Sequence, residues 1–372
     1  MYPSNFDIGI QEEYQIISPE TRELLGYVSR SMTDGSLVVQ ERDPETDLNR
    51  KIGEAMFAEK IPFYVDISEA SGQLLRTRQA LLDLVQAQGF QLMGAGTHPF
   101  SNWMDAPLLA PRYQKIHKDA QMVARRMLAF GLHVYIGVGS QDLAIDIMNT
   151  MRYFMPYLLS LATSSPFWLK DNTGLKSYRT VLFNALPRTG IPDTYPSYQA
   201  YRDNIHTLIQ TGSITDAGKI WYDIMPSHRH PALLVRICDM LPNYKDTLAM
   251  AALIQAMVAW MVALRENNMA FRIYKRPLIQ ENKWRAVRYG IEGEMIDFGK
   301  EEPVETRALI HELLGRVTPM ARRLNSTRAL EHVATMLTRG TCADQQLAVW
   351  KESGEDFNRV VDFLAAETEK TA

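Results

Sequence analysis

The chain has 372 residues, of which 46% are hydrophobic and 22% are charged. These proportions are typical of a soluble globular protein, and a chain of this length buries a large core without disulfides or structural metals. The 40 basic and 43 acidic side chains give a formal net charge of −3. Charge therefore gives no reason to expect nucleic acid or a membrane as a partner.

Three features of the sequence concern the location of the protein. Cys238 and Cys342 are far apart and form no CxxC pair, which favours a reducing cytoplasm. The first residues show no basic segment followed by an apolar run, so we expect no signal peptide. The longest apolar stretch, Leu248–Leu264, contains Gln255 and is flanked by charged residues. This pattern predicts a buried core helix and argues against a membrane span.

Hydrophobic periodicity predicts mixed strands and helices first, and almost only helices after Asp246. The predicted strands are Asp7–Ile17, Phe90–Ala95, Gly131–Gly137, Trp221–Ile224 and Ala232–Cys238. The predicted helices are Leu74–Ala87, Arg112–Phe130, Asp142–Thr163, Asp246–Glu266, Gln280–Tyr289, Glu305–Arg323, Thr327–Thr338 and Ala343–Glu369. Antiparallel-type strands followed by gathered helices indicate an α+β fold with one open sheet. Without a repeat or linker, we expect a single domain over 1–372, mainly helical from about 246 to 372.

Polar side chains at strand spacing predict a polar trough on this sheet. Successive side chains of a strand point to opposite faces, so Gln11, Glu13 and Gln15 share one face of the first strand. By the same rule His133 and Tyr135 point the same way from the strand GLHVYIG. Antiparallel neighbours would aim these groups into one space.

One further strand residue, Arg236, shares a face with Leu234. Each polar strand residue also has a structural alternative. Glu13 can face solvent, His133 can be a satisfied core histidine, and Arg236 can be an ion-pair partner of Asp239. Periodicity alone does not choose between these alternatives.

Two loops carry further candidate site residues. His98 lies in the turn GAGTHPF, at the end of a predicted strand, where functional residues are often found. The turn-rich stretch that follows the helix Asp142–Thr163 carries Trp168, Tyr178 and Arg179, and arginine with aromatic rings can bind an anionic or planar ligand. The alternatives are a structural turn and an ordinary surface loop. The chain has no phosphate-loop, dinucleotide-binding, GxSxG or HExxH motif.

Several of these segments together resemble a known family. The segments GIQEEY, GAGTHPF, GLHVYIG, LATSSPFW, TGLKSYR, LVRICD and NKWRAVRYGIEGE stand in the order typical of type-2 glutamate–cysteine ligases, especially their bacterial carboxylate–amine ligase branch. The resemblance extends from about Asp7 to about Glu369. It implies a fold like the catalytic domain of glutamine synthetase, with an antiparallel sheet forming a trough backed by helices. It also implies that ATP and magnesium phosphorylate a carboxylate, usually the γ-carboxylate of glutamate, before an amine displaces the phosphate.

This chain departs from the family motifs at positions expected to hold metal ions or phosphates. Gln11 stands at the first acid of G-[IV]-E-x-E, whereas Glu13 keeps the second. Tyr135 replaces the second histidine of H-V-H, and Met225 replaces the arginine of W-D-[IV]-R-P. Leu234 replaces the glutamate of T-[LV]-E-V-R. Each lost carboxylate weakens a divalent-cation site, because the number of charged ligands sets the affinity for hard cations.

A further family acid corresponds to Ala58 in an ungapped comparison, or to Glu59 after a one-residue slip. Lys51 stands where the family commonly has another acid, and a lysine there would repel a cation. We therefore expect no metal site. The weak candidates, if a metal is bound, are Glu13, Glu54 and His133.

The resemblance and its departures leave three functions open. The first is ATP-independent amide or acyl chemistry on an amino-acid-like, γ-glutamyl-type carboxylate. The second is an ATP-dependent ligase that retains ATP and magnesium, and the third is a non-catalytic partner subunit in a heteromer with a related ligase. For all three we expect a small-molecule substrate and a cytoplasmic location, and a homodimer is plausible.

The residues expected to carry the function follow from the trough and the loops. The candidate general acid–base groups are His133, Glu13, Tyr135 and His98. The candidate substrate-binding residues are Arg179, Arg236, Tyr178, Trp168 and Gln11.

Overall fold

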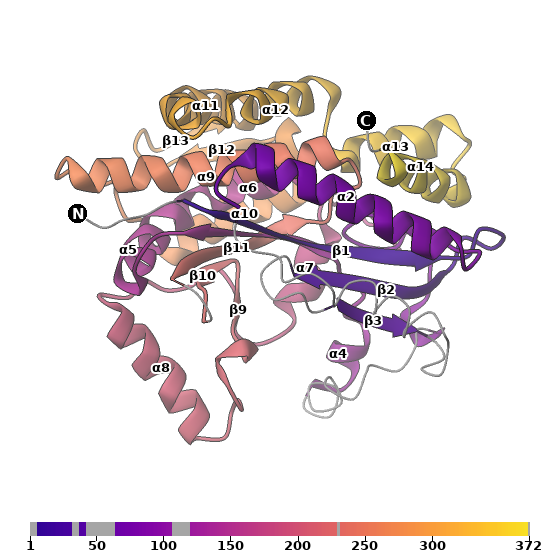
Figure 1. Cartoon of the computed structure of the whole chain (residues 1–372), viewed down its shortest axis with the longest axis horizontal. Helices are drawn as coiled ribbons and strands as arrows, with labels where there is room; N and C mark the ends of the chain where they lie inside the picture. Colours follow the sequence, from indigo (N-terminus) through magenta and orange to yellow (C-terminus); the bar gives the residue numbers. More distant parts are fainter. Residues whose placement is uncertain (1–5, 32–36, 42–63, 106–119, 229–230, 371–372) are drawn as a thin grey trace.

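The central element of the molecule is an antiparallel sheet with the strand order β10-β11-β5-β1-β2-β3, to which β4 adds by pairing with β1 (Figure 1). The computed structural model describes residues 6–31, 37–41, 64–105, 120–228 and 231–370. The strands are β1 (Ile8–Ile17), β2 (Leu24–Ser31), β3 (Leu37–Glu41), β4 (Gln91–Met93), β5 (Gly131–Gly137), β10 (Ile224–Pro226) and β11 (Ala232–Asp239). The predicted α+β class is confirmed, because helices accompany antiparallel pairing throughout this sheet.

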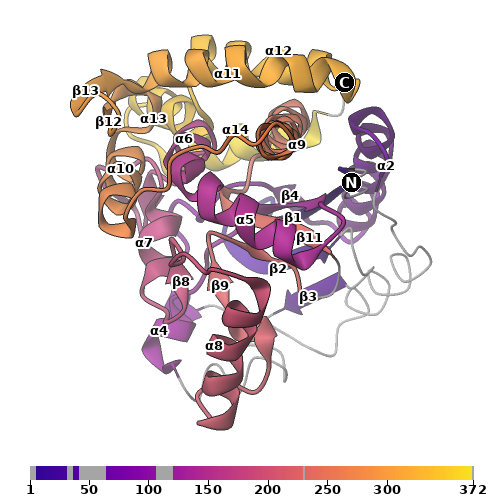
Figure 2. The same cartoon turned by 90° about the vertical axis from the view of Figure 1, so that its left-hand side faces the viewer.

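Helices lie on both sides of the sheet, as Figures 1 and 2 show. On one side are α2 (Ile67–Gln86), α9 (Tyr244–Glu266), α11 (Thr306–Arg323) and α12 (Thr327–Arg339). Toward the other side lie α4 (Met122–Arg125), α7 (Tyr178–Asn184) and α8 (Tyr198–Gln210). The remaining helices are α5 (Gln141–Met151), α6 (Met155–Leu161), α10 (Arg276–Tyr289), α13 (Cys342–Glu352) and α14 (Phe357–Glu369). Between α10 and α11 the chain forms a hairpin of β12 (Glu294–Asp297) and β13 (Glu302–Glu305).

Strand β1 separates two environments by simple alternation. Ile8, Ile10, Glu12 and Tyr14 point toward the helices and are at most 4% exposed. The residues between them point to the open side of the sheet, the face toward α7 and α8. The predicted side-chain alternation of β1 therefore divides a core face from a polar face.

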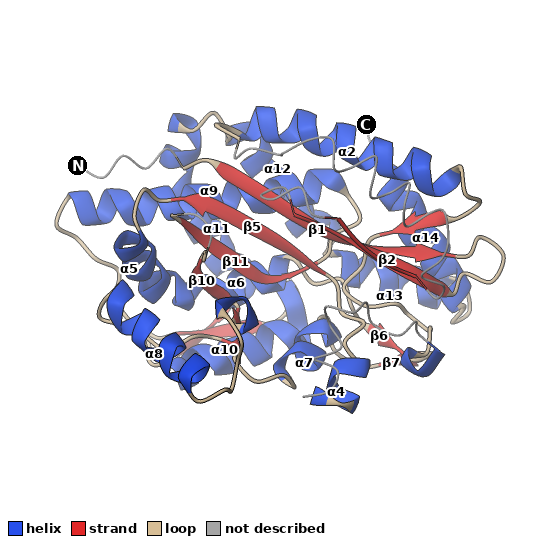
Figure 3. Cartoon of the chain, turned by 60° about the horizontal axis from the view of Figure 1, so that its bottom comes forward, coloured by secondary structure: helices blue, strands red, loops and turns tan. Residues whose placement is uncertain are grey.

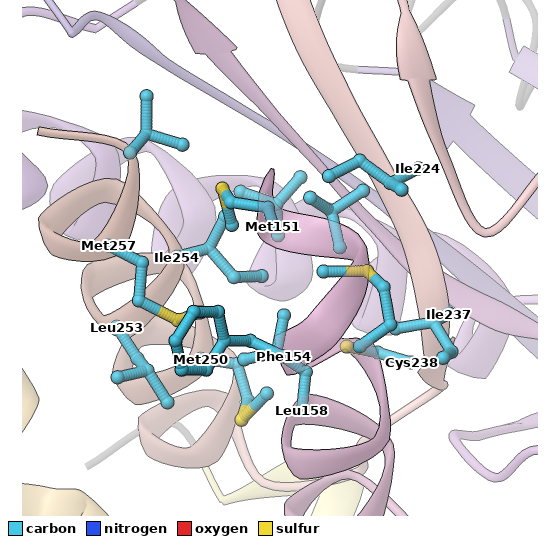
Figure 4. Packing of buried hydrophobic residues seen from close by; sticks show 14 of the residues in the cluster. Met151, Phe154, Leu158, Ile224, Ile237, Cys238, Met250, Leu253, Ile254 and Met257 are labelled. Atoms are coloured by element: carbon cyan, nitrogen blue, oxygen red, sulfur yellow. The ribbon is translucent and has the colours of Figure 1, made fainter. Parts of the chain in front are cut away.

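Helix α9 is the core element that the apolar stretch predicts. It is long and apolar enough to span a membrane, but 83% of its most apolar 18-residue segment is buried within the molecule. Figure 4 shows Met250 of α9 beside Leu158 of α6, and Ile237 of β11 belongs to the same hydrophobic cluster. This contact fixes the helix layer against the sheet.

Several predicted elements differ from the observed ones. The hairpin β2–β3 was not predicted, because its alternation is weak and it forms by pairing with β1. The helix predicted over Arg112–Phe130 does not reach its predicted end: α4 ends at Arg125, and the backbone of Phe130 bonds with Gly96 and Met240. The long predicted last helix divides into α13 and α14 around Gly354, whose φ is +74°.

A buried ion pair anchors β1 to the helix layer. Arg78 of α2 donates to both oxygens of Glu12, and Thr247 of α9 donates to Glu12 Oε1 at 3.0 Å. Arg78 also donates to the carbonyl of Pro242 at 2.6 Å, and its side chain is 1% exposed. Such a pair is costly to break from one side, because the remaining charge stays buried without a partner.

We expect Arg78→Met to lower the free energy of unfolding by about 3–5 kcal/mol, because it leaves the Glu12 carboxylate buried and unpaired. The double variant Glu12→Gln/Arg78→Met should lose less than Arg78→Met alone, since it buries no net charge. Equilibrium unfolding in urea measures both. A loss below about 1 kcal/mol for Arg78→Met would show that the pair is not an anchor.

Candidate functional site

The register of the sheet brings the predicted polar strand residues together on its open face, seen from below in Figure 3. Gln11 of β1 lies opposite His133 of β5, and Tyr135 of β5 lies opposite Leu234 of β11. Arg236 follows two residues later on the same face of β11 as Leu234. Strands from three separate parts of the chain therefore form one polar surface, which we call the trough.

Two contacts organise the β1–β5 part of the trough. The Tyr135 hydroxyl donates to Gln11 Oε1 at 3.3 Å. Glu13 accepts a hydrogen bond from the backbone N–H of Gly131 at 2.7 Å. The third residue of this face, Gln15, is fully buried and donates to the carbonyl of Ala95 at 3.1 Å, so it belongs to the packing beyond the trough.

Two guanidinium groups meet beside these residues. Arg179, near the start of α7, and Arg236 both lie over the ring of Phe183, each 5.4 Å from its centroid. Arg179 donates to the carbonyls of Arg236 and Ile237 at 3.3 and 3.4 Å. The Nε atoms of both arginines are buried and meet no hydrogen-bond partner among the residues that the structure describes.

His133 is the imidazole next to this pair. It is 4% exposed, and its Nε2 atom finds no hydrogen-bond partner within the described part of the chain. Burial, reinforced by the charges of Arg236 and Arg179, holds the pKa of His133 well below its ordinary value. The ring is therefore neutral at pH 7 and can accept a hydrogen bond.

The position of Arg179 depends on Asp239 at the end of β11. Asp239 is 0% exposed and accepts hydrogen bonds from Ser164 N–H, Ser165 Oγ and Ser177 Oγ at 2.7–2.9 Å. Its Oδ1 lies 3.9 Å from Arg179 Nη1. Burial raises the pKa of Asp239, while Arg179 and these hydrogen bonds act in the opposite direction. The sequence suggested that Asp239 could form an ion pair with Arg236. In the structure, the arginine that pairs with Asp239 is Arg179.

Gly131 gives the guanidinium of Arg179 the room that it occupies. A Cβ built on Gly131 would lie 2.3 Å from Arg179 Nη2, far inside any allowed contact. The same residue donates its N–H to Glu13. Gly131 leaves this space open because it has no Cβ, and its φ angle is not in the left-handed region that favours glycine.

His98 lies apart from this cluster and has a structural environment. Its Nε2 is 2.9 Å from the carbonyl of Arg22, and its Nδ1 accepts from the N–H groups of Phe100 and Ser101. Burial lowers the pKa of His98 to about 3, so the ring is neutral. Because both ring nitrogens are engaged, the geometry favours a turn-fixing role over the acid–base role suggested by the sequence.

Trp168 and Tyr178 pack against each other, with ring centroids 5.6 Å apart. Trp168 is 8% exposed and belongs to a hydrophobic cluster with Leu182 and Met240. Tyr178 directly precedes Arg179 at the start of α7, and Trp168 packs on Tyr178 from the hydrophobic cluster. Their predicted substrate-binding role stays a prediction.

The apolar replacements lie at the β10–β11 end of the trough. Met225 lies opposite Leu234 in the register, and both are at most 5% exposed. They join the same hydrophobic cluster as Tyr201 and Ile205 of α8. The predicted candidates in the following list lie outside the described residues: Lys51, Glu54, Ala58 and Glu59.

Three neighbours of the site were not identified from the sequence. Phe183 supports both guanidinium groups, and its spacing of four residues from Arg179 on α7 is the signal that could have found it. Asp223 and Lys283 form a buried ion pair at 2.6 Å, and the charge of Asp223 reaches Arg236. Residues 223 and 283 are far apart in sequence, so no local pattern predicts their contact.

Comparison with known proteins identifies the family. A family model described as glutamate–cysteine ligase family 2 matches residues 7–362. Over 98% of its length the chain is 41% identical to a Chloroflexus aggregans protein named "Putative glutamate--cysteine ligase 2", of which 92% is covered. Proteins of the same name from Solibacter usitatus and Sorangium cellulosum are 42% and 43% identical, with 98% and 96% of this chain and 94% and 95% of theirs covered. The chain belongs to glutamate–cysteine ligase family 2, a family of carboxylate–amine ligases.

Two solved structures share the fold at low sequence identity. A glutamate–cysteine ligase from Francisella tularensis, in complex with AMP, superposes with a TM-score of 0.63 at 12% identity, covering 98% of this chain and 88% of that one. A bifunctional glutathione synthetase from Pasteurella multocida gives a TM-score of 0.62 at 12% identity, covering 97% of this chain and 52% of that one. At this identity the likeness concerns the fold alone.

We expect Gly131→Ala to destabilise the protein by about 2–4 kcal/mol, because the new methyl group displaces the Arg179 guanidinium. The matched control is Gly315→Ala, at a helical position where an added Cβ meets nothing within 4 Å. That control should be neutral or more stable by up to about 1 kcal/mol. Thermal unfolding compares the two, and equal stabilities would contradict the close approach of Arg179 to Gly131.

Buried neutral histidines predict an acid-sensitive stability. The pKa of His98 is about 3 when folded and about 6.5 when unfolded, so the unfolded state binds more protons between these values. Stability therefore rises with pH in this window, and acidification from pH 7 to pH 5 should cost about 2 kcal/mol through His98 alone. Unfolding measured at pH 5, 6 and 7 should show a shallower slope for His98→Asn. An unchanged slope in that variant would assign the acid sensitivity to other groups.

Proposed function

We propose that the trough binds an amino-acid-like carboxylate, of the γ-glutamyl type, and that this chain acts on its amide or acyl group without ATP and magnesium. One observation carries the proposal. Three buried polar atoms, Arg179 Nε, Arg236 Nε and His133 Nε2, meet no hydrogen-bond partner among the described residues. Such atoms are rare in folded proteins, because each costs about 1–3 kcal/mol when left unsatisfied.

The chemistry of these atoms fits a carboxylate ligand. Guanidinium groups bind carboxylates through charge-assisted hydrogen bonds, and both Nε–H groups are donors that require an acceptor. Phe183 holds the two guanidinium planes in position, which reduces the entropy lost when a ligand is bound. A γ-glutamyl group would place its α-carboxylate here and its amide toward His133.

The described donor set does not fit a multinuclear magnesium centre. Hard cations need several carboxylate oxygens, yet no group of three or more His, Cys, Asp or Glu side chains gathers in the part of the chain that the structure describes. Glu13 is the carboxylate on the trough face of β1, and it lies beside the cation of Arg236. Leu234 and Met225 offer no charge for a metal or a phosphate. The trough residues that the structure describes therefore favour the ATP-independent function.

The proposed reaction uses the neutral His133 ring as a general base, because the carboxylate bound by Arg179 and Arg236 offsets the two charges that lower the pKa of His133. Nε2 takes a proton from water or from an acceptor amine as the nucleophile adds to the amide carbonyl carbon. The C–N bond of the substrate then breaks, and the same proton passes to the leaving amine. Tyr135, whose hydroxyl donates to Gln11, would turn to donate to the developing oxyanion, with Glu13 holding the Gly131 backbone in place.

The proposal includes the form of the sheet, the oligomeric state and the cellular location. The order of the antiparallel strands and the open polar face support a trough like that of the glutamine synthetase catalytic domain. We also propose a homodimer in the cytoplasm. A heteromer with a related ligase, in which this chain is a non-catalytic subunit, is an outcome that the following experiment distinguishes.

The experiment combines calorimetry with turnover of γ-glutamyl-p-nitroanilide. We expect binding of L-glutamate to weaken about 100-fold in Arg236→Met and to stay within about twofold in the matched surface control Arg359→Met. His133→Ala should retain glutamate binding and lose turnover, because it removes the base alone.

Other results would assign a different function. Micromolar binding of ATP that depends on magnesium would overturn the ATP-independent proposal in favour of an ATP-dependent ligase. Absence of turnover, together with a stable complex with a related ligase, would favour a partner subunit. Undiminished glutamate binding in Arg236→Met would contradict the placement of the carboxylate.

A further inference from the structure

A second cleft is lined by residues of α2, α9 and α12. Figure 2 shows these three helices on the same side of the sheet. Its volume is about 530 Å³, which is within the range of small-molecule sites. The trough faces the opposite side of the sheet, so this cleft is separate from the proposed γ-glutamyl site. An inference about it does not depend on the proposed function.

The lining of this cleft is basic. Lys245 from the first turn of α9 and Arg328 from the first turn of α12 both line it, together with His332. No carboxylate is among its lining residues in the described part of the chain. The chain as a whole carries a net charge of −3, so a concave surface whose lining includes Lys245 and Arg328 but no carboxylate among the described residues is a local departure from the average.

The carboxylate nearest in sequence is already neutralised. Asp246 is 2% exposed and is 2.8 Å from His332 Nε2 and 2.6 Å from Arg339 Nη2. Lys245 lies over the ring of Tyr244, 5.7 Å from its centroid, and forms no ion pair among the described residues. The positive charges of Lys245 and Arg328 therefore remain available to a ligand.

Neutral donors and an apolar wall complete the cleft. Ser68, Ser71 and Tyr244 contribute hydroxyl groups. The first N–H groups of α12 have no side-chain cap, because the Ser326 hydroxyl bonds to the carbonyl of Ala321 instead. Apolar side chains of Ile67, Leu248 and Ala329 also line the cleft. This combination suits an anionic group joined to an apolar body.

We propose that the cleft between α2, α9 and α12 binds a small phosphate monoester. Lys245 and Arg328 neutralise the phosphate, the hydroxyls of Ser68 and Ser71 donate to its oxygens, and the apolar wall covers the organic part. A phosphate offers the larger charge and the greater number of acceptor oxygens, so it satisfies two cations and several donors better than a single carboxylate does.

The cleft is connected to the sheet by consecutive residues of α9. Lys245 faces the ligand, Asp246 bonds to α12, and Thr247 donates to Glu12 of β1. A ligand held between α2 and α9 would therefore stabilise the junction that also contains the Arg78–Glu12 ion pair. Because it binds the folded state, the ligand raises the unfolding temperature.

The test uses phenyl phosphate as the probe on the full-length protein. We expect binding with a Kd of about 1 mM or below, together with a rise in unfolding temperature. Lys245→Met and Arg328→Gln should each weaken binding about tenfold or more. Inorganic phosphate should bind more weakly than phenyl phosphate, since it leaves the apolar wall uncovered, and benzoate should bind more weakly still.

Matched controls separate the site from general charge effects. Lys351→Met and Arg359→Gln remove exposed cations from α13 and α14, away from the cleft, and should leave binding unchanged. The proposal is overturned if phenyl phosphate does not bind at about 10 mM, or if the control variants lose as much affinity as the cleft variants. L-glutamate binding in the trough should be the same in all four variants.

Discussion

The buried carboxylate of Asp239 is the interaction on which the trough depends. At the end of β11 it joins three segments: the loop after α6 through Ser164 and Ser165, the start of α7 through Ser177, and the guanidinium of Arg179. All these partners are buried, so their hydrogen bonds are made within the protein or not at all. The carboxylate thereby places Arg179 over Gly131 and next to Arg236, and it sets the distance between two cations that would otherwise repel each other.

Strand β1 carries the second constraint, because neighbouring acids serve opposite sides of the sheet. Glu12 points to the helices and is held by Arg78 and Thr247, whereas Glu13 points to the trough and holds the backbone of Gly131. The first acid stabilises the layer packing, and the second positions the strand that carries His133. Strand β1 thus connects the Arg78–Glu12 ion pair on the helix side of the sheet to the Glu13–Gly131 contact on the trough side.

The apolar end of the trough belongs to the hydrophobic core. Leu234 and Met225 lie opposite each other in the sheet and belong to the same hydrophobic cluster as Tyr201 and Ile205 of α8. The polar part of the trough is correspondingly confined to β1, β5 and the Arg236 end of β11. The two guanidinium groups of the trough attract anions and repel cations.

The sequence by itself determined the alternation of β1, β5 and β11, the buried helix α9, the α+β class and the family. These features follow from local periodicity and ordered motifs, which a linear chain displays directly. It also identified His133, Arg179 and Arg236 as candidates, but it treated His98 in the same way. The tertiary structure decided that both ring nitrogens of His98 are engaged in a turn, that Arg179 is the partner of Asp239, and that Phe183 supports two cations. The β2–β3 hairpin and the Asp223–Lys283 pair were likewise decided by contacts between distant segments. Such contacts depend on register and packing, and no short window of sequence contains both partners.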